Sequence, residues 1–223
     1  MKLALFDLDH TLIAFDSGMA FTRFLVERGV LPAQAEETYL DHCRQYVAGT
    51  LDIHAMHRAS VAPLARYSRA RLAAKADEFE AELRPRASAA MQALVRRHLD
   101  AGDLCALVTA TTRFIAEPCA RLFGLSNLIA TEAATVNGEP GGELTGEIDG
   151  LPCYREHKVT RVEQWLAQRG APPIAGFERS WFYSDSAGDL PLLRAVSDAV
   201  AVRPDPRLRA IALGAGWDVV DAV

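Results

Sequence analysis

Two carboxylates, Asp7 and Asp9, end the first apolar segment of the chain. The segment Leu3 to Phe6 is apolar without interruption, which favours a strand buried on both faces of a parallel sheet. Because side chains alternate along an extended chain, Asp7 and Asp9 are expected to point the same way at the carboxyl end of that strand. Two adjacent negative charges cost free energy unless a cation lies between them or one of them is protonated.

Three interpretations of this segment are open. The simplest is a strand followed by a solvated turn. A calcium-binding EF-hand loop also begins with two aspartates at this spacing, but it needs glycine at its sixth position, where this chain has Leu12. The third is a nucleophilic carboxylate with a neighbouring acid/base, placed where open α/β sheets bind ligands.

Polar residues of complementary kinds follow other apolar segments of the chain. Thr109, Ala110 and Thr111 follow the apolar run that begins at Leu104, Lys158 opens a predicted helix, and Asp185 and Asp189 follow the run Trp181-Phe182-Tyr183. In a parallel sheet the carboxyl ends of all strands lie along one edge, so residues roughly a hundred positions apart can meet there. We therefore expect these groups to share one site with Asp7 and Asp9.

The charges of this set predict phosphoryl chemistry. Converging carboxylates repel one another, and Mg²⁺, which prefers oxygen ligands and accepts phosphate oxygens, would relieve that repulsion. The Thr109 hydroxyl, the backbone N–H groups of Ala110 and Thr111 and the Lys158 ammonium are suitable donors to a phosphoryl group. Asp7 could then attack phosphorus in line, while Asp9 protonates the leaving oxygen and later activates a water.

The elements that must position these groups are predicted from apolar periodicity and from capping residues. Helices are expected behind Asp16 or Ser17, from Pro32 to about Ala48, from Asp52 and from Ser68. Because these segments contain no strand pattern, we expect residues 16–85 to form a helical cap domain inserted after the first strand, over an α/β core of residues 1–15 and 86–223. Further strands are predicted at 104–108, 128–131, 181–183 and 199–202, with a small β-hairpin flap within 136–150.

Composition limits the classes of function. The 223 residues are half apolar and carry a net charge of -5 without a basic run, which argues against a nucleic-acid partner. Arg96-Arg97-His98, the densest basic cluster, is expected on the solvent face of a helix.

We find no apolar stretch of membrane-spanning or signal-peptide length and predict a cytoplasmic protein without a membrane partner. The oligomeric state is not readable.

The set of motifs resembles the haloacid dehalogenase superfamily, in its phosphoserine-phosphatase-like branch. The segment Asp7-Leu8-Asp9-His10-Thr11 matches the first motif of that family, Thr109 the second, Lys158 the third, and Asp185 with Asp189 the fourth. All four occur in the family's order, and the helical insertion resembles the cap domain of the branch. The resemblance spans nearly the whole chain.

The resemblance implies specific roles. Asp7 is the expected nucleophile and Asp9 the acid/base, with Mg²⁺ held by Asp7, Asp185 and the backbone carbonyl of Asp9. Asp189 would support the metal or Lys158. Asp16 lies where relatives carry an acidic residue that meets a substrate amine, although a helix N-cap explains it equally well.

One position departs from the family pattern. Gly188 stands where close relatives usually carry Asn, which helps to order the phosphate end of the pocket, so substrate or rate is expected to differ.

The predicted function is a Mg²⁺-dependent phosphomonoesterase that acts on a small phosphorylated metabolite through an aspartyl phosphate. Phosphoserine, histidinol phosphate and other amino alcohol phosphates fit equally well. A phosphotransferase would use the same intermediate. A receiver-like signalling module also clusters Asp, Thr and Lys, but it lacks a helical insertion and a second aspartate like Asp9. A non-catalytic ligand-binding relative is the remaining alternative.

Overall fold

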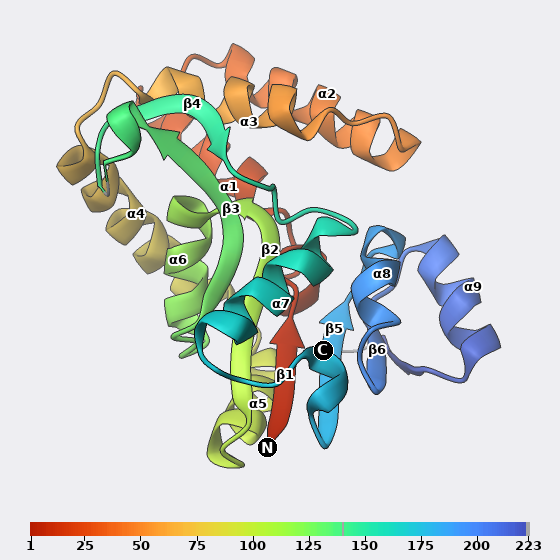
Figure 1. Ribbon diagram of the computed structural model, residues 1–223. Helices are drawn as coiled ribbons and strands as arrows, with labels where there is room; N and C mark the ends of the chain where they lie inside the picture. The colour runs from red at the N-terminus through yellow and green to blue at the C-terminus, as the bar shows by residue number, and fades with distance from the viewer. Residues whose placement is uncertain (140, 222–223) are drawn as a thin grey trace.

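The computed structural model of the protein describes residues 1–139 and 141–221. Within them, one seven-stranded sheet has the strand order β4-β3-β2-β1-β5-β6-β7 (Figure 1). Neighbouring strands are parallel, except for β3 and β4, which run antiparallel. The strands are β1 Lys2–Phe6, β2 Leu104–Thr112, β3 Leu128–Thr135, β4 Leu144–Asp149, β5 Arg179–Ser184, β6 Asp198–Val202 and β7 Asp218–Val220.

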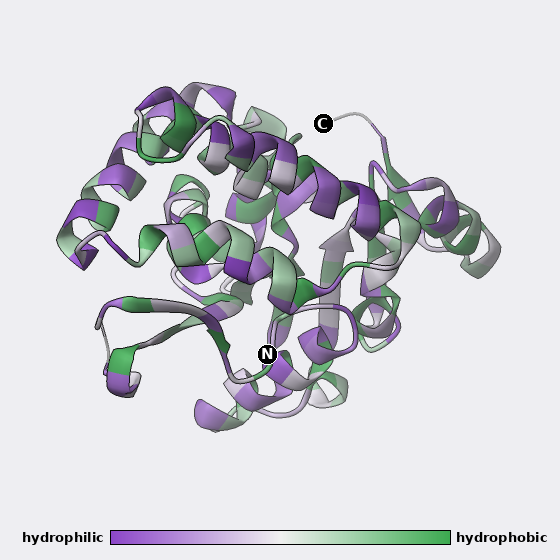
Figure 2. Ribbon diagram, turned by 90° about the horizontal axis from the view of Figure 1, so that it is seen from above, coloured by the Kyte–Doolittle hydropathy of each residue, from purple (hydrophilic) through white to green (hydrophobic). Residues whose placement is uncertain are grey.

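Helices cover both faces of this sheet, which confirms the predicted doubly wound α/β class. Helices α5 (Ala89–Asp100) and α6 (Arg113–Leu122) contribute to the hydrophobic core on one face. Helices α7 (His157–Gln168), α8 (Leu190–Leu193) and α9 (Pro206–Ala215) contribute to the core on the other. Seen along the strands, the helices show hydrophilic and hydrophobic residues in patches, as expected for helices with one buried face (Figure 2).

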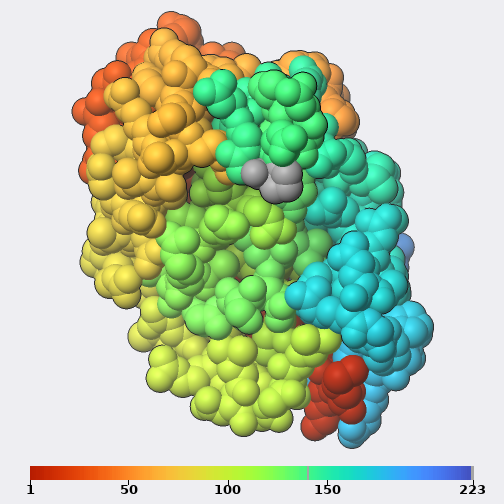
Figure 3. Space-filling view, turned by 60° about the vertical axis from the view of Figure 1, so that its left-hand side comes forward, coloured from red at the N-terminus to blue at the C-terminus, as the bar shows by residue number. Residues whose placement is uncertain are grey.

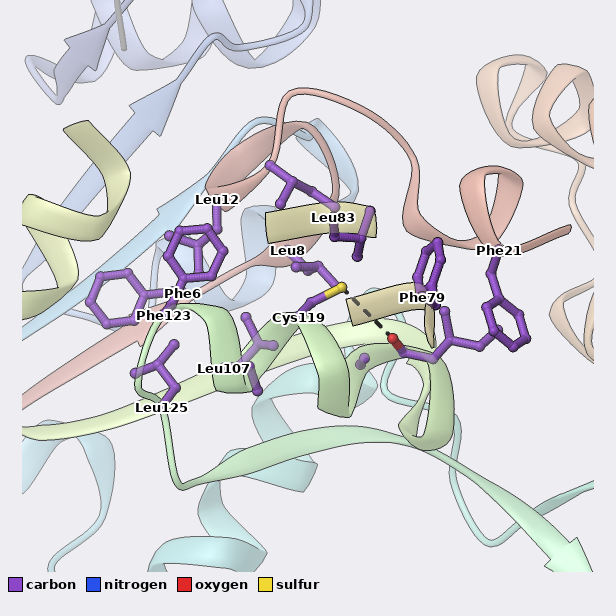
Figure 4. Close-up of a cluster of buried hydrophobic side chains, with 14 of the residues drawn as sticks. Phe6, Leu8, Leu12, Phe21, Phe79, Leu83, Leu107, Cys119, Phe123 and Leu125 are labelled. Atoms are coloured by element: carbon purple, nitrogen blue, oxygen red, sulfur yellow. Dashed lines mark hydrogen bonds between the residues drawn. The ribbon is translucent and has the colours of Figure 1, made fainter. Parts of the chain in front are cut away.

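Strand β1 is buried on both faces, as its unbroken apolar sequence predicts. Leu3 and Leu5 belong to one hydrophobic core, and Ala4 and Phe6 belong to the other. All four side chains are fully buried. Figure 4 shows Phe6 together with Leu107 of β2 and with side chains from α6 and the segment that follows it. Because a fully buried large apolar side chain contributes about 1.5–3 kcal/mol, β1 is fixed firmly at the centre of the sheet.

A helical insertion, residues 16–85, separates β1 from α5 and lies over the carboxyl ends of the central strands (Figure 1). Three of its helices begin at N-caps that the sequence predicts: the side chains of Asp16, Asp52 and Ser68 each accept a backbone N–H of the first turn. That the insertion is a separate domain stays a prediction. Its helices are α1 Ser17–Glu27, α2 Gln34–Ala48, α3 Ile53–Val61 and α4 Arg69–Leu83.

The hairpin differs from the prediction in its bounds, because only its second strand, β4, lies within 136–150 and its first strand is β3. The β3–β4 hairpin continues the sheet at its edge. It also meets the helical insertion, as the adjoining orange and green surfaces in Figure 3 show. Gly146 of β4 has a φ of +92°, and a Cβ atom there would lie only 2.6 Å from the Cβ of Ala62. Glycine is therefore needed both for the backbone conformation and for close packing of the edge strand on the insertion.

Two local features differ from the sequence analysis. Strand β7 is too short, at three residues, to produce an alternating pattern, and it was not predicted. The expectation that His98 lies on the solvent face of its helix is wrong. His98 is buried, with its ring nitrogens 2.7 Å from Asp103 Oδ2 and 2.8 Å from Tyr183 Oη.

Among the described residues, no helix is long and apolar enough to cross a bilayer.

A buried histidine joins the helical insertion to the sheet and yields a prediction about acid stability. His57 of α3 places Nδ1 3.3 Å from the Thr112 hydroxyl of β2. Burial lowers the pKa of His57 to about 4. Between this value and the ordinary histidine pKa of about 6.5, the unfolded chain binds a proton that the folded chain does not, so stability falls as pH falls.

We expect this histidine to remove on the order of 1–3 kcal/mol from the free energy of unfolding as pH falls from about 7 to about 4. Urea unfolding at several pH values would measure this loss. His57→Gln, which cannot titrate, should show a flatter dependence than the parent over the same range. Parallel curves for the two proteins would contradict the assignment.

Candidate active site

Asp7 follows β1 directly and is held in line with the sheet by its own backbone. Its N–H donates to the Tyr183 carbonyl of β5 at 2.9 Å. The chain then turns through residues 8–12, where His10 adopts a φ of 58°. Arg203, just after β6, donates to the carbonyls of His10 and Thr11 at 2.9 and 2.6 Å. This loop is therefore fixed from both β5 and β6, and it carries Asp7, Asp9 and Thr11.

Lys158 joins the nucleophile candidate to the fourth motif. Its ammonium donates to Asp7 Oδ1 at 2.8 Å and to Asp189 Oδ2 at 2.7 Å, and all three side chains are buried. Ser184 donates to the same Asp189 oxygen at 2.8 Å. The structure therefore brings together three predicted site residues that are far apart in the sequence.

The pKa shifts of Asp7 and Lys158 show that the negative and positive charges of this arrangement do not balance. Burial raises the pKa of Asp7 to about 6, although the Lys158 charge acts against that rise. Burial alone would lower the pKa of Lys158, but the charges of Asp189 and Asp7 raise it well above its ordinary value. One buried cation serves two carboxylates, so the lysine is fully compensated whereas each carboxylate is not.

Asp185 adds a further negative charge beside Asp7. The Thr11 hydroxyl lies 3.2 Å from Asp7 Oδ2 and 3.3 Å from Asp185 Oδ1, and it accepts the Asp185 N–H at 3.0 Å. Its single hydrogen cannot serve both carboxylates fully. Burial, followed by the charges of Asp7 and Asp189, raises the pKa of Asp185 to about 8. The site thus has a surplus of negative charge between Asp7 and Asp185.

This surplus fits a hard divalent cation. The donors that the sequence analysis predicts, Asp7, Asp185 and the backbone carbonyl of Asp9, are oxygen ligands of the kind that Mg²⁺ prefers. Among residues 1–139 and 141–221, no group of three or more His, Cys, Asp or Glu side chains is arranged to hold a metal. A Mg²⁺ ion held by Asp7 and Asp185 would take its other ligands from backbone, water and substrate, as Mg²⁺ commonly does.

Asp9 has a different environment from Asp7. It accepts the Ser17 N–H at 2.6 Å and the Thr111 hydroxyl at 2.7 Å. Burial, followed by the charge of Asp16, raises the pKa of Asp9 to about 7. A carboxyl group with a pKa near neutrality can both give and take a proton, which suits general acid/base chemistry.

The end of β2 forms the third side of the site. The pairing of β2 with β3 shifts register between Val108 and Thr112, which marks a bulge around the predicted phosphate-binding residues. Thr109 Oγ1 accepts the Thr111 N–H at 3.1 Å, which leaves the Thr109 hydroxyl hydrogen for another acceptor. The Thr111 amide and hydroxyl are both engaged here, so direct phosphate binding by Thr111, as by Ala110, stays a prediction.

Asp16 has the structural role that the sequence analysis left open. Its Oδ1 accepts the Met19 N–H at 2.7 Å, as a helix N-cap does, and the Tyr39 hydroxyl at 2.8 Å. A contact with a substrate amine stays a prediction.

Several groups at the site were not singled out from the sequence. Thr11 belongs to the quoted first motif and Ser184 directly precedes Asp185, so their positions were visible but their bonds were not. Ser17 contributes its backbone N–H, and the Arg203 side chain donates to backbone carbonyls. No pattern in the sequence indicates such contacts.

Comparisons with known proteins found a family model and two curated relatives that match most of the chain. The family model described as haloacid dehalogenase-like hydrolase matches residues 4–194. A curated histidinol-phosphatase of Neisseria meningitidis serogroup C (strain 8013) is 42% identical over 222 residues, which cover 99% of this chain and 98% of that protein. A curated phosphoserine phosphatase of Mycobacterium tuberculosis is 33% identical over 228 residues, covering 98% of this chain and 70% of that protein.

Solved structures share the fold. A protein of unknown function from Bordetella pertussis Tohama I is 43% identical and has a TM-score of 0.89, covering 99% of this chain and 98% of that one. A substrate-bound phosphoserine phosphatase has a TM-score of 0.67 at 16% identity, covering 99% and 93% of the two chains, and is similar in fold.

The buried Lys158 yields a prediction about stability. Lys158→Met keeps most of the length of the side chain but leaves Asp7 and Asp189 buried without their cation. Because an uncompensated buried charge is costly, we expect the free energy of unfolding to fall by about 3–5 kcal/mol. Urea unfolding at neutral pH in the presence of EDTA would measure the loss.

Lys75→Met is a matched control, because Lys75 pairs with Glu78 on the outside of α4. Solvent screens that pair, so its loss should have a much smaller effect. Equal effects of the two substitutions would show that Lys158 is not the cation on which the site depends.

Proposed function

This chain belongs to the haloacid dehalogenase-like hydrolases and is a phosphatase, and we propose that it is a Mg²⁺-dependent phosphomonoesterase for a small phosphorylated amino alcohol. Histidinol phosphate is the first candidate substrate, because the relative named histidinol-phosphatase matches essentially the whole chain. Phosphoserine is the second, from the 33% identical relative. The observation that carries the proposal is that the two aspartates have different hydrogen-bond partners. Asp7 is bonded to Lys158 and Thr11, whereas Asp9 is bonded to Ser17 and Thr111.

In the first step a carboxylate oxygen of Asp7 attacks phosphorus, and the bond from phosphorus to the alcohol oxygen breaks. Asp9 in its protonated form gives its proton to that oxygen, so the alcohol leaves neutral. A pKa of about 7 keeps a substantial fraction of Asp9 protonated at neutral pH. The products of this step are the free alcohol and a phosphoryl group bound to Asp7.

In the second step Asp9, now ionised, takes a proton from a water molecule that attacks the same phosphorus. The bond to Asp7 breaks, and inorganic phosphate leaves with Asp7 restored. Asp9 thus reverses its role between the steps, which needs a carboxyl group close to the reacting oxygen but not bonded to Asp7.

The phosphoryl oxygens need positive charge and donors throughout. Lys158, the Thr109 hydroxyl and the backbone at Ala110 and Thr111 would supply them from the protein. Mg²⁺ held by Asp7, Asp185 and the Asp9 carbonyl would neutralise further charge on these oxygens. Asp189 holds Lys158 in place from the opposite side.

A phosphotransferase would share the first step and differ only in what attacks the phosphoryl group on Asp7. We favour hydrolysis, because two of the relatives that match along nearly the whole chain are named as phosphatases. Identification of a phosphorylated product after addition of a second alcohol would favour transfer instead.

The nucleophile can be tested by substitution. We expect the parent to release phosphate from histidinol phosphate with Mg²⁺ and to lose that activity with EDTA. Asp7→Asn should lower kcat by at least about 10³-fold, because the amide cannot form the phosphoryl bond. Asp198→Asn should retain activity, because Asp198 pairs with Arg179 at the amino ends of β5 and β6, away from the carboxyl ends that carry the site. A rate for Asp7→Asn within tenfold of the parent would show that another group attacks.

The acid/base can be tested with an aryl phosphate, whose leaving group needs little protonation. We expect Asp9→Asn to lower steady-state turnover about 10²–10⁴-fold, mainly by slowing the attack of water. The phosphoryl group should then remain on Asp7, where mass spectrometry of the acid-quenched protein would detect it. Thr111→Val, which removes one bond to Asp9 but keeps its carboxyl group, should have a smaller effect. An Asp9→Asn variant that turns over without accumulating phosphoprotein would exclude this role.

A further inference from the structure

A tyrosine of the helical insertion contacts the loop that carries the fourth motif. Tyr46 lies in the last turn of α2, and its hydroxyl is 2.6 Å from the Ser186 hydroxyl. Ser186 follows Asp185 directly and accepts the Gly188 N–H at 3.1 Å. The contact therefore links the insertion to the acidic loop, which we define as residues 185–189.

Gly188 provides the space that Tyr46 occupies. A Cβ atom at residue 188 would lie 3.2 Å from the Tyr46 hydroxyl and 3.3 Å from the Ser186 hydroxyl, closer than most real contacts of a Cβ atom. The φ of Gly188 is not in the left-handed region, so its backbone does not require glycine. A side chain at residue 188 would therefore meet the hydroxyls of Tyr46 and Ser186, which would have to shift by a few tenths of an ångström.

Other contacts hold the same end of α2 near the loop that precedes Lys158. The rings of Tyr46 and Tyr154 are 6.2 Å apart, and Arg155 lies 4.9 Å from the Tyr154 ring centroid. Arg155 also donates to the Gly49 carbonyl, which ends α2, at 3.5 Å. The end of α2 thus meets the two loops that deliver Asp185, Asp189 and Lys158 to the site.

The hydroxyl of Tyr46 keeps its hydrogen under all ordinary conditions. Tyr46 is 39% exposed, and its partial burial raises the pKa above the ordinary value, with the nearby charges of Asp189 and Asp7 acting in the same direction. Tyr46 and Ser186 therefore form a neutral hydrogen bond at a site otherwise dominated by charge.

We propose that Tyr46 is a positioning residue that holds the end of α2 on the acidic loop through Ser186, and that Gly188 and Tyr46 are a matched pair. This contact favours the arrangement in which the helical insertion lies over the site. It thereby sets the apparent affinity for substrate without touching the reacting atoms. The kinetic part of this inference rests on the proposed function, whereas the structural part does not.

Hydrogen exchange measures the contact without any substrate. Tyr46→Phe keeps the ring and removes the hydroxyl, so we expect amide exchange in the last turn of α2 and in residues 185–189 to rise about 3- to 10-fold. That range corresponds to the loss of one hydrogen bond of ordinary strength. Tyr67→Phe removes a comparable tyrosine bond, to the Val30 carbonyl, elsewhere in the insertion and should leave those segments unchanged. Unchanged exchange in Tyr46→Phe would overturn the proposal, even if the protein were inactive on every phosphate ester.

The matched pair is tested by placing Gly188→Ala in two backgrounds. In the parent the added methyl group should displace the Tyr46 hydroxyl and raise exchange as Tyr46→Phe does. In the Tyr46→Phe background it should add less than about twofold, because the contact is already lost. Equal increments in the two backgrounds would show that residue 188 acts independently of Tyr46.

Kinetics separate positioning from chemistry. With p-nitrophenyl phosphate and histidinol phosphate as probes, Tyr46→Phe and Ser186→Ala should each raise KM about 3- to 10-fold, and the double variant should do no more than either. The kcat at saturating substrate should stay within about twofold, because substrate then holds the insertion in place. A fall in kcat with KM unchanged would overturn this role for Tyr46.

Discussion

The buried ammonium of Lys158 between Asp7 and Asp189 is the interaction on which the site depends. Each of these side chains would be unstable as a lone charge in the interior, and only their contact makes the burial of all three tolerable. The contact also determines the chemistry. It fixes one Asp7 oxygen and leaves Asp7 and Asp185 short of positive charge on the side facing Thr11. The proposed metal site and the proposed phosphoryl site would both arise from this imbalance.

The sheet explains how groups so distant in sequence reach one another. Strands β1, β2 and β5 are adjacent and parallel, so their carboxyl ends deliver Asp7, Thr109 and Asp185 to one edge. The helical insertion contributes through the start of α1, where the Ser17 N–H donates to Asp9. Two aspartates separated by one residue therefore acquire different partners, and different roles become available to them.

Much of this was readable from the sequence, because its signals are local. The apolar run of β1, the caps at Asp52 and Ser68 and the glycine that ends α2 each depend on neighbouring residues, and each appears where it was expected. The motif residues could be placed at one edge by topology alone. Contacts that arise only in three dimensions were not readable. His98 looked like part of a basic surface because its partner Tyr183 lies 85 residues away, and Gly188 looked like an isolated departure because Tyr46 belongs to another part of the chain.

The clamp that Arg203 places on the carbonyls of His10 and Thr11 has a consequence for biosynthesis. The loop bearing Asp7 is among the first segments to leave the ribosome, whereas Lys158 follows only after about seven-tenths of the chain has been made and Arg203 after about nine-tenths. A nascent chain therefore carries its acidic loop first without its buried cation and then without the Arg203 clamp, and contacts of such long range are slow to form. Catalytic competence should thus arrive late and abruptly during translation, and a fragment that ended before β6 would contain both aspartates of the first motif yet lack the anchor that shapes their loop.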